Sequence, residues 1–201
     1  DVVVLSTQHR VPTVSFVALM KFTAHSADSA ASVPPIATPT RAAFAALAAR
    51  PAGTATTGIG NDRSNRIVGN GAKNKLFGRD GHDLLDGAGG NDVLDGGDGN
   101  DTLRGGSGGD TMLGGEDNDV YEVNSASDRV KEGFGDGIDT VHSSATTYTL
   151  GKHVENLEIV GAGLHGKGNT LANKITDNSA DNRLQGLGGN DNLAGGGGND
   201  T

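Results

Sequence analysis

The sequence lacks cysteine and tryptophan, and aromatic residues make up only 3% of its 201 positions. Without cysteine, neither disulfide bonds nor thiolate metal sites can stabilise the fold, which is compatible with a secreted protein that gains stability from a metal ion. With so few large apolar side chains, the chain cannot build a conventional core along its whole length. Its apolar runs, 2–5 and 16–20, are too short to span a bilayer, so we expect no transmembrane segment.

Positive charge is also scarce. The chain has 16 Lys and Arg against 25 Asp and Glu, which gives a formal net charge of −9. No basic stripe is available to meet phosphates, so nucleic acid is excluded as a partner. The acidic excess falls within residues 60–122, where we expect a cation to bind.

Glycine is abundant and periodic. A nine-residue pattern runs seven times in unbroken register over residues 60–122, and each copy begins with glycine. Position six carries an amide or carboxylate, namely Asn65, Asn74, Asp83, Asp92, Asp101, Asp110 and Asp119. Position eight is apolar, namely Ile67, Leu76, Leu85, Leu94, Leu103, Met112 and Tyr121. A second block, residues 168–201, carries Asn173, Asn182, Asp191 and Asp200 in the sixth column.

This period predicts a solenoid of alternating turns and strands. Glycines at positions one, two and four should supply positive φ angles, so the first six residues form a turn and the last three a short strand. Because alternate strand side chains face opposite ways, position eight should point inward. Two units then make one coil of 18 residues, and repeat n lies over repeat n+2. The position-six carboxylates should therefore form two rows.

Such a coil is poorly stabilised by itself. One buried apolar side chain per nine residues returns less free energy than the ordering of nine backbones costs. Stacked carboxylates add repulsion, which a hard divalent cation bound by carboxylate and carbonyl oxygens would cancel in the folded state alone. We therefore expect calcium-coupled folding.

The repeats Gly96–Leu103 and Gly105–Met112 match every defined position of G-G-x-G-x-D-x-U-x. The chain thus resembles the repeats-in-toxin (RTX), or hemolysin-type, calcium-binding family. The resemblance implies an all-β fold, a parallel β-roll that is a right-handed β-helix solenoid, with several Ca²⁺ ions as cofactors. It places the ions between turns n and n+2: between Asp83 and Asp101, between Asp101 and Asp119, and between Asp92 and Asp110.

The resemblance also implies the ligands. The side chains are those of Asp83, Asp92, Asp101, Asp110, Asp119, Asp191 and Asp200, and the backbone carbonyls are those near Gly78, Gly81, Gly87, Gly90, Gly96, Gly99, Gly105 and Gly108. Asn65 and Asn74 depart from the pattern, so the first two repeats should bind weakly or cap the roll. Asp191 and Asp200 would pair only with asparagines, so we expect incomplete sites there.

Outside the repeats the sequence is less regular. Residues 1–59 read as a mostly disordered linker with at most one short helix, from Thr40 to Pro51, or as the remnant of an upstream domain. Residues 123–167 predict a β-rich spacer that continues the solenoid, with strands near 128–132, 138–141, 147–150 and 156–160. There we interpret Asp136 and Asp139 as solvated turn carboxylates rather than ligands. The second block is incomplete at its C-terminal end.

Two catalytic motifs occur out of context. Residues 105–109 satisfy G-x-S-x-G, but Ser107 lies in a repeat turn rather than before a helix. Residues 161–166 satisfy G-x-G-x-x-G, but no helix pattern follows. We therefore expect this chain itself not to be an enzyme.

The resemblance implies a secreted, extracellular bacterial module that folds on calcium binding outside the cell, with type I secretion machinery as a partner. An alternative is the calcium-binding and secretion part of a secreted enzyme, such as a serralysin-like metalloprotease, lipase or epimerase, whose catalytic domain is not in this chain. A third interpretation is a fragment of an adhesin or surface-layer protein.

Overall fold

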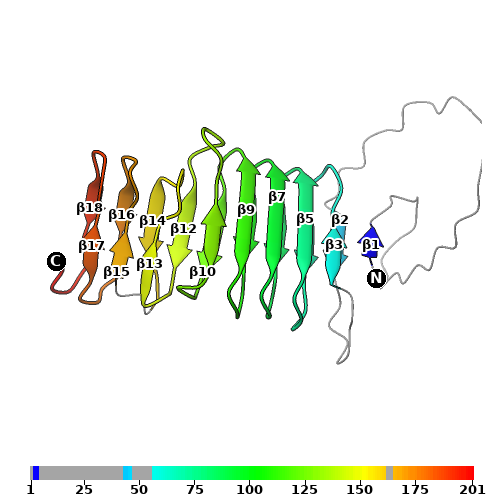
Figure 1. Cartoon of the computed structure of the whole chain (residues 1–201), viewed down its shortest axis with the longest axis horizontal. Coiled ribbons are helices and arrows are strands. Elements are labelled where there is room, and N and C mark those ends of the chain that lie inside the picture. Colours follow the sequence, from blue (N-terminus) through cyan, green and yellow to red (C-terminus); the bar gives the residue numbers. More distant parts are fainter. Residues whose placement is uncertain (1, 5–42, 47–55, 162–164) are drawn as a thin grey trace, which may run out of the picture. The chain divides into compact units, whose positions relative to one another are not determined.

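The computed structural model describes residues 2–4, 43–46, 56–161 and 165–201, and every regular element in these ranges is a β-strand (Figure 1). No helix long and apolar enough to cross a membrane occurs in them. One sheet has the order β1 (Val2–Val4), β3 (Thr57–Ile59), β5 (Lys75–Asp80), β7 (Val93–Asp98), β9 (Thr111–Glu116) and β11 (Arg129–Lys131).

A second sheet collects the other strand of each coil. Its order is β18 (Asn192–Ala194), β16 (Lys174–Thr176), β14 (Asn156–Ile159), β12 (Thr140–Ser143), β10 (Val120–Val123), β8 (Thr102–Arg104), β6 (Leu84–Asp86), β4 (Asn65–Val68) and β2 (Ala43–Ala46). A third sheet contains β13 (Thr147–Thr149), β15 (His165–Lys167) and β17 (Arg183–Gln185). All pairings are parallel, which confirms the predicted parallel β-solenoid.

The register follows the expected coil. Leu94 of β7 pairs with Leu76 of β5 and with Met112 of β9, and Leu85 of β6 pairs with Leu103 of β8. Each partner lies two repeats away, so the prediction that repeat n stacks on repeat n+2 is confirmed.

Position eight forms the core, as predicted. All seven of its residues in the main block, from Ile67 to Tyr121, are 0% exposed. In the spacer the same column is continued by Val130, Val141, Tyr148 and Leu157, all buried. Leu193 is 44% exposed in the last described coil, because no further coil covers it. One side chain per strand therefore fills the interior from β4 to β9, whereas β10 buries both Tyr121 and Val123, and β14 buries both Leu157 and Ile159.

Residues 123–167 keep the coil and contain all four expected strands, β11 to β14. One turn here is longer and the next is shorter. The Asp119 amide donates to Asp139 Oδ1, 20 residues later, and the Asp139 amide donates to Glu155 Oε2, only 16 residues later. Because the two deviations cancel, the block that begins at Gly168 is in register with the first.

Two expectations need correction. Residues 43–46, inside the expected short helix, form strand β2, which pairs with β4. A helix this short has an unfavourable nucleus, whereas an added parallel strand makes ladder hydrogen bonds at once. The other calls on residues 1–59 lie outside the described residues, apart from β1 and β3.

The second correction concerns position-one glycine. Positive φ occurs at positions two and four, for example 110° at Gly97 and 114° at Gly99, but at no position-one glycine of the main block. Glycine is required there for close approach instead: a Cβ on Gly87 would lie 2.5 Å from the carbonyl oxygen of Gly105 and would also clash with Asp92 Oδ2. Position one therefore brings carbonyl and carboxylate oxygens together.

Candidate metal centre

The position-six side chains form two rows along the coils. The first row precedes the strands of the nine-stranded sheet and contains Asp83, Asp101, Asp119 and Asp139. The second row precedes β7, β9 and β11 and contains Asp92, Asp110 and Asp128. All seven carboxylates are buried, with at most 5% of the residue exposed.

One oxygen of each carboxylate is satisfied by the neighbouring coil. Oδ1 of Asp101 accepts from the Asp83 amide at 2.7 Å, and the Asp101 amide donates in turn to Oδ1 of Asp119 at 2.7 Å. In the second row the Asp92 amide donates to Oδ1 of Asp110 at 2.8 Å. These hydrogen bonds link repeats n and n+2 at the predicted pairs.

The other oxygen has no such partner. Oδ2 is buried without a hydrogen bond at Asp83, Asp92, Asp101, Asp110, Asp119 and Asp139. Burial raises the pKa of Asp101 to about 8 and that of Asp119 to about 7, more than the backbone amides lower it. Burial also raises the pKa of Asp92 to about 6. A buried carboxylate oxygen without a partner destabilises the fold unless a cation binds it.

The oxygens next to Oδ2 are hard donors as well. A Cβ on Gly96 would clash with Asp101 Oδ2 and with the carbonyl oxygen of Gly114 two repeats later. The same pair of oxygens surrounds Gly78 and Gly87. Carboxylate and carbonyl oxygens are the ligands that Ca²⁺ prefers, so the donor set fits this ion.

The asparagine turns show what the aspartate turns lack. Asn65 Nδ2 donates to the carbonyl oxygens of Asn61, at 2.9 Å, and Arg63, and to Asp83 Oδ1 at 3.0 Å. Asn173 Nδ2 likewise donates to the Val154 carbonyl oxygen at 3.1 Å. The side-chain amide thus donates hydrogen bonds where a carboxylate oxygen cannot, and it carries no charge, so Asn65 and Asn173 do not require a cation.

The remaining predicted ligands lie near the C-terminal end of the chain. Oδ1 of Asp191 accepts from the Asn173 amide at 2.9 Å, and Oδ1 of Asp200 accepts from the Asn182 amide at 3.0 Å. Asp191 is partly buried and Asp200 is exposed. Their pairing with asparagines is the one expected from the sequence, and it differs from the carboxylate pairs of the main block.

The sequence interpretation missed three acidic residues. Asp139 is only 1% exposed, so its interpretation as a solvated turn carboxylate is wrong. Asp136, interpreted in the same way, is partly buried. Asp128 extends the second row, but both of its oxygens are satisfied, because Oδ2 accepts from the amides of Asn124 and Ser125. Glu132 lies beside the first row. The nine-residue spacing from Asp119 to Asp128 was a signal for Asp128, whereas the longer turn concealed Asp139.

Ser107 does not belong to a nucleophile elbow. Its amide donates to the Ala88 carbonyl oxygen at 3.0 Å within the turn, and strand β9 follows it rather than a helix. The glycine motif at 161–166 lies partly outside the described residues.

Comparison with known proteins agrees with this geometry. The family model described as the RTX calcium-binding nonapeptide repeat matches four times, over residues 59–94, 86–121, 95–130 and 167–201, more than half of the chain. Searches of curated proteins and of solved structures gave no significant match.

Proposed function

Because the chain belongs to the RTX family of calcium-binding nonapeptide repeats, we propose that its aspartate rows bind several Ca²⁺ ions and that this binding folds the roll. The observation that carries the proposal is the series of six buried Oδ2 atoms without a hydrogen-bond partner. Each one requires a cation if the carboxylate is to stay ionised in the folded state.

We assign the main sites to three pairs: Asp83 with Asp101, Asp101 with Asp119, and Asp92 with Asp110. The members of each pair are joined by an amide-to-Oδ1 hydrogen bond between repeats n and n+2. Backbone carbonyls near the glycines at positions one and four, from Gly78 to Gly108, would complete the coordination. Asp191 and Asp200, each paired with an asparagine, would contribute weaker sites.

Calcium binding and folding are coupled in this proposal because the ligands come from separate coils. Asp83 and Asp101 are 18 residues apart and meet only when their coils stack. An ion that binds the stacked state alone stabilises it by an amount that grows with the logarithm of the ion concentration relative to the dissociation constant. The chain would then be unfolded where calcium is scarce and folded where calcium is plentiful.

This coupling suits a secreted protein. Calcium modules outside cells typically have dissociation constants of roughly 10⁻⁴ to 10⁻³ M, so extracellular calcium would act as the switch. We propose export in the unfolded state by type I secretion machinery, followed by folding outside the cell.

The alternative, a calcium-binding and secretion part of a larger secreted enzyme, differs in what accompanies this chain. An H-E-x-x-H motif or a true nucleophile elbow encoded upstream of Asp1 would favour the enzyme. Further repeats or adhesive domains would favour the binding module or the adhesin.

A calcium titration tests the proposal. Far-ultraviolet circular dichroism should change from a coil spectrum to a β spectrum as calcium is added, with bound ions counted on the same sample. Magnesium should be ineffective, because it prefers a smaller octahedral site and keeps its water. A β spectrum in metal-free buffer, unchanged by calcium, would overturn the proposed coupling.

A further inference from the structure

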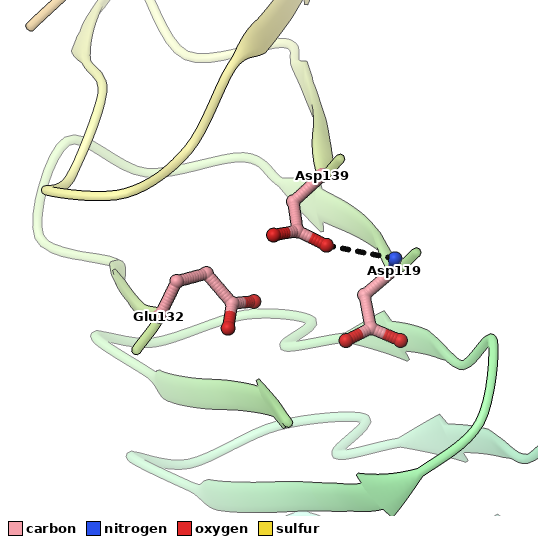
Figure 2. Close-up of side chains that lie close together, drawn as sticks. All are labelled: Asp119, Glu132 and Asp139. Atoms are coloured by element: carbon pink, nitrogen blue, oxygen red, sulfur yellow. Dashed lines mark hydrogen bonds between the residues drawn. The ribbon is translucent and has the colours of Figure 1, made fainter. Parts of the chain in front are cut away.

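Three carboxylates gather where the main repeat block meets the spacer. Asp119, Glu132 and Asp139 each place one carboxylate oxygen within 4.8 Å of the other two. Figure 2 shows the Glu132 carboxylate pointing toward those of Asp119 and Asp139. The three residues come from two turns: Asp119 ends the turn before β10, whereas Glu132 and Asp139 begin and end the turn between β11 and β12.

Glu132 occupies a position that is glycine in every repeat of the main block. It lies at position one of the nine-residue register that begins at Gly60. At Gly114, the corresponding residue of an ordinary repeat, a Cβ would clash with Asp119 Oδ2. A glutamate side chain can be accommodated at 132 because the following turn is two residues longer: Asp139 lies 20 residues after Asp119 rather than 18.

The longer turn is itself held against the repeat below. The Ile138 amide donates to Asn118 Oδ1 at 2.8 Å, and the Asp119 amide donates to Asp139 Oδ1 at 2.9 Å. A Cβ on Gly137 would clash with the Asp117 carbonyl oxygen, so this turn also needs glycine to approach closely. These contacts hold Asp139 beside Asp119 and direct the turn around Glu132.

Within the described residues, no cationic side chain forms an ion pair with the cluster. Oδ2 of Asp119 and Oδ2 of Asp139 are buried without a hydrogen bond, and both residues are 1% exposed. Both Glu132 oxygens are buried too. The ion pairs within the described ranges are Arg104 with Glu122 and His142 with Glu158, and neither touches the cluster. Burial, followed by the charges of Asp139 and Asp119, raises the pKa of Glu132 to about 9.

We propose that Asp119, Glu132 and Asp139 form a further calcium site that does not follow the repeat pattern and that joins the main block to the spacer. Three carboxylates supply hard, anionic oxygen ligands. An ion about 2.4 Å from each ligand oxygen separates opposite ligands by about 4.8 Å, so the observed spacing admits Ca²⁺. With the ion bound, the turn over 132–139 is fixed to the repeat that ends at Glu122.

This inference rests on the proposed calcium binding of the repeats, and Glu132→Gln separates the two. The variant removes one charge with little change in volume, and it leaves the aspartate pairs of the main block intact. Glu116→Gln is the matched control, because Glu116 is exposed in the preceding turn. The measurement is calcium binding by isothermal titration calorimetry on the full chain, with the ions counted at saturation.

Wild type and Glu116→Gln should bind the same number of ions. Glu132→Gln should bind one ion fewer, or one ion about tenfold more weakly, because it lacks one of three anionic ligands. The β content at saturating calcium should stay the same, which shows that the variant folds. Identical ion counts and affinities in all three proteins would overturn the site at Glu132 while leaving the repeat sites standing. Absence of calcium binding by the wild type would instead overturn the proposed function itself.

Terbium provides a second readout, local to the cluster, for a Glu132→Gln protein that keeps the β content of the wild type. The Tyr121 hydroxyl and Asp119 Oδ2 would both clash with a Cβ on Gly114, so they are neighbours and the ring can sensitise a lanthanide bound at Asp119. Tyrosine-sensitised terbium emission should decrease in Glu132→Gln and remain in Glu116→Gln. Equal emission from the two variants would contradict the proposal.

Discussion

Asp101→Asn tests most directly whether the aspartate rows require a cation. Asp101 lies within the first row, where its Oδ1 accepts from the Asp83 amide and its own amide donates to Asp119 Oδ1, both at 2.7 Å. Asparagine keeps Oδ1 and replaces the unpartnered Oδ2 with an NH₂ group. That group can donate to a turn carbonyl, as Asn65 Nδ2 does to Asn61. The variant should therefore have opposite effects with and without calcium.

Without calcium, the variant should be the more stable protein. Burial raises the pKa of Asp101 from 3.8 to about 8, so at pH 7 the carboxylate destabilises the folded state by roughly 4 kcal/mol relative to the unfolded chain. Asparagine does not ionise and avoids this cost. With calcium, two proposed sites each lose an anionic ligand. If each binds about tenfold more weakly, the loss is roughly 3 kcal/mol.

Two measurements separate these effects, both followed by far-ultraviolet circular dichroism. One is urea unfolding in calcium-saturated buffer; the other, because the metal-free chain should be unfolded, is the concentration of the osmolyte TMAO that folds it in metal-free buffer. Asp98→Asn is the control, because Asp98 is exposed in the same turn and should change neither midpoint by much. Asp191→Asn should shift the calcium-saturated midpoint less than Asp101→Asn, because Asp191 is paired only with Asn173. An Asp101→Asn protein that is less stable than wild type in both buffers would refute the requirement for a cation.

Three further predictions concern the calcium-free charge, the core and the turns. Since burial raises the pKa of Asp101 to about 8, the folded state without calcium binds more protons than the unfolded chain between pH 3.8 and about 8. Its stability relative to the unfolded chain should therefore fall as pH rises through that window, and more TMAO should be needed to fold the metal-free chain. A TMAO midpoint that decreases with pH there, in samples free of light scattering, would contradict this. Leu94→Ala should lower the free energy of unfolding in calcium by about 2–5 kcal/mol, because Leu94 is 0% exposed. Leu193→Ala should lower it far less, because Leu193 is 44% exposed. Equal losses of unfolding free energy, measured by urea unfolding, would show that position eight does not form the core. Gly87→Ala should raise the calcium concentration at the midpoint of folding, because the new Cβ displaces Asp92 Oδ2 or the Gly105 carbonyl oxygen. Gly71→Ala should leave this midpoint unchanged, because a Cβ there meets nothing within 4 Å. Equal midpoints for the two variants in a calcium titration would refute the close-approach role of position one.

Much of the fold was predictable because each coil contacts mainly the coils beside it. In such a solenoid a local nine-residue pattern specifies turn, strand and inward side chain at once, and repetition specifies the stack. Leu76, Leu94 and Met112 lie in one buried ladder for this reason alone. The aspartate pairs of the main block were predictable in the same way, since a fixed period fixes which turns are neighbours.

The contacts made by the irregular turns could not be predicted from the nine-residue period. Glu132 stands at a glycine position, and only the longer turn before Asp139 shows that its carboxylate enters the first row. The apolar composition of residues 43–46 is also compatible with a helix, and it is the parallel pairing with β4 that makes this segment a strand. The reason for position-one glycine was also hidden, because the clash it avoids is with Oδ2 of its own repeat and a carbonyl two repeats away.

The sequence by itself determined the repeat, the inward apolar column, the two rows of acidic residues and the likeness to a calcium-binding family, because all of these follow from the nature and spacing of residues along the chain. Only the tertiary structure decided which carboxylate oxygens lack a partner, that asparagine turns supply their own donor, and that Glu132 joins Asp119 and Asp139. The asparagine donors depend on how each turn folds back on its own carbonyl oxygens. The carboxylate cluster depends on contacts between residues 16 to 20 positions apart, where turn length rather than residue type sets which oxygens meet.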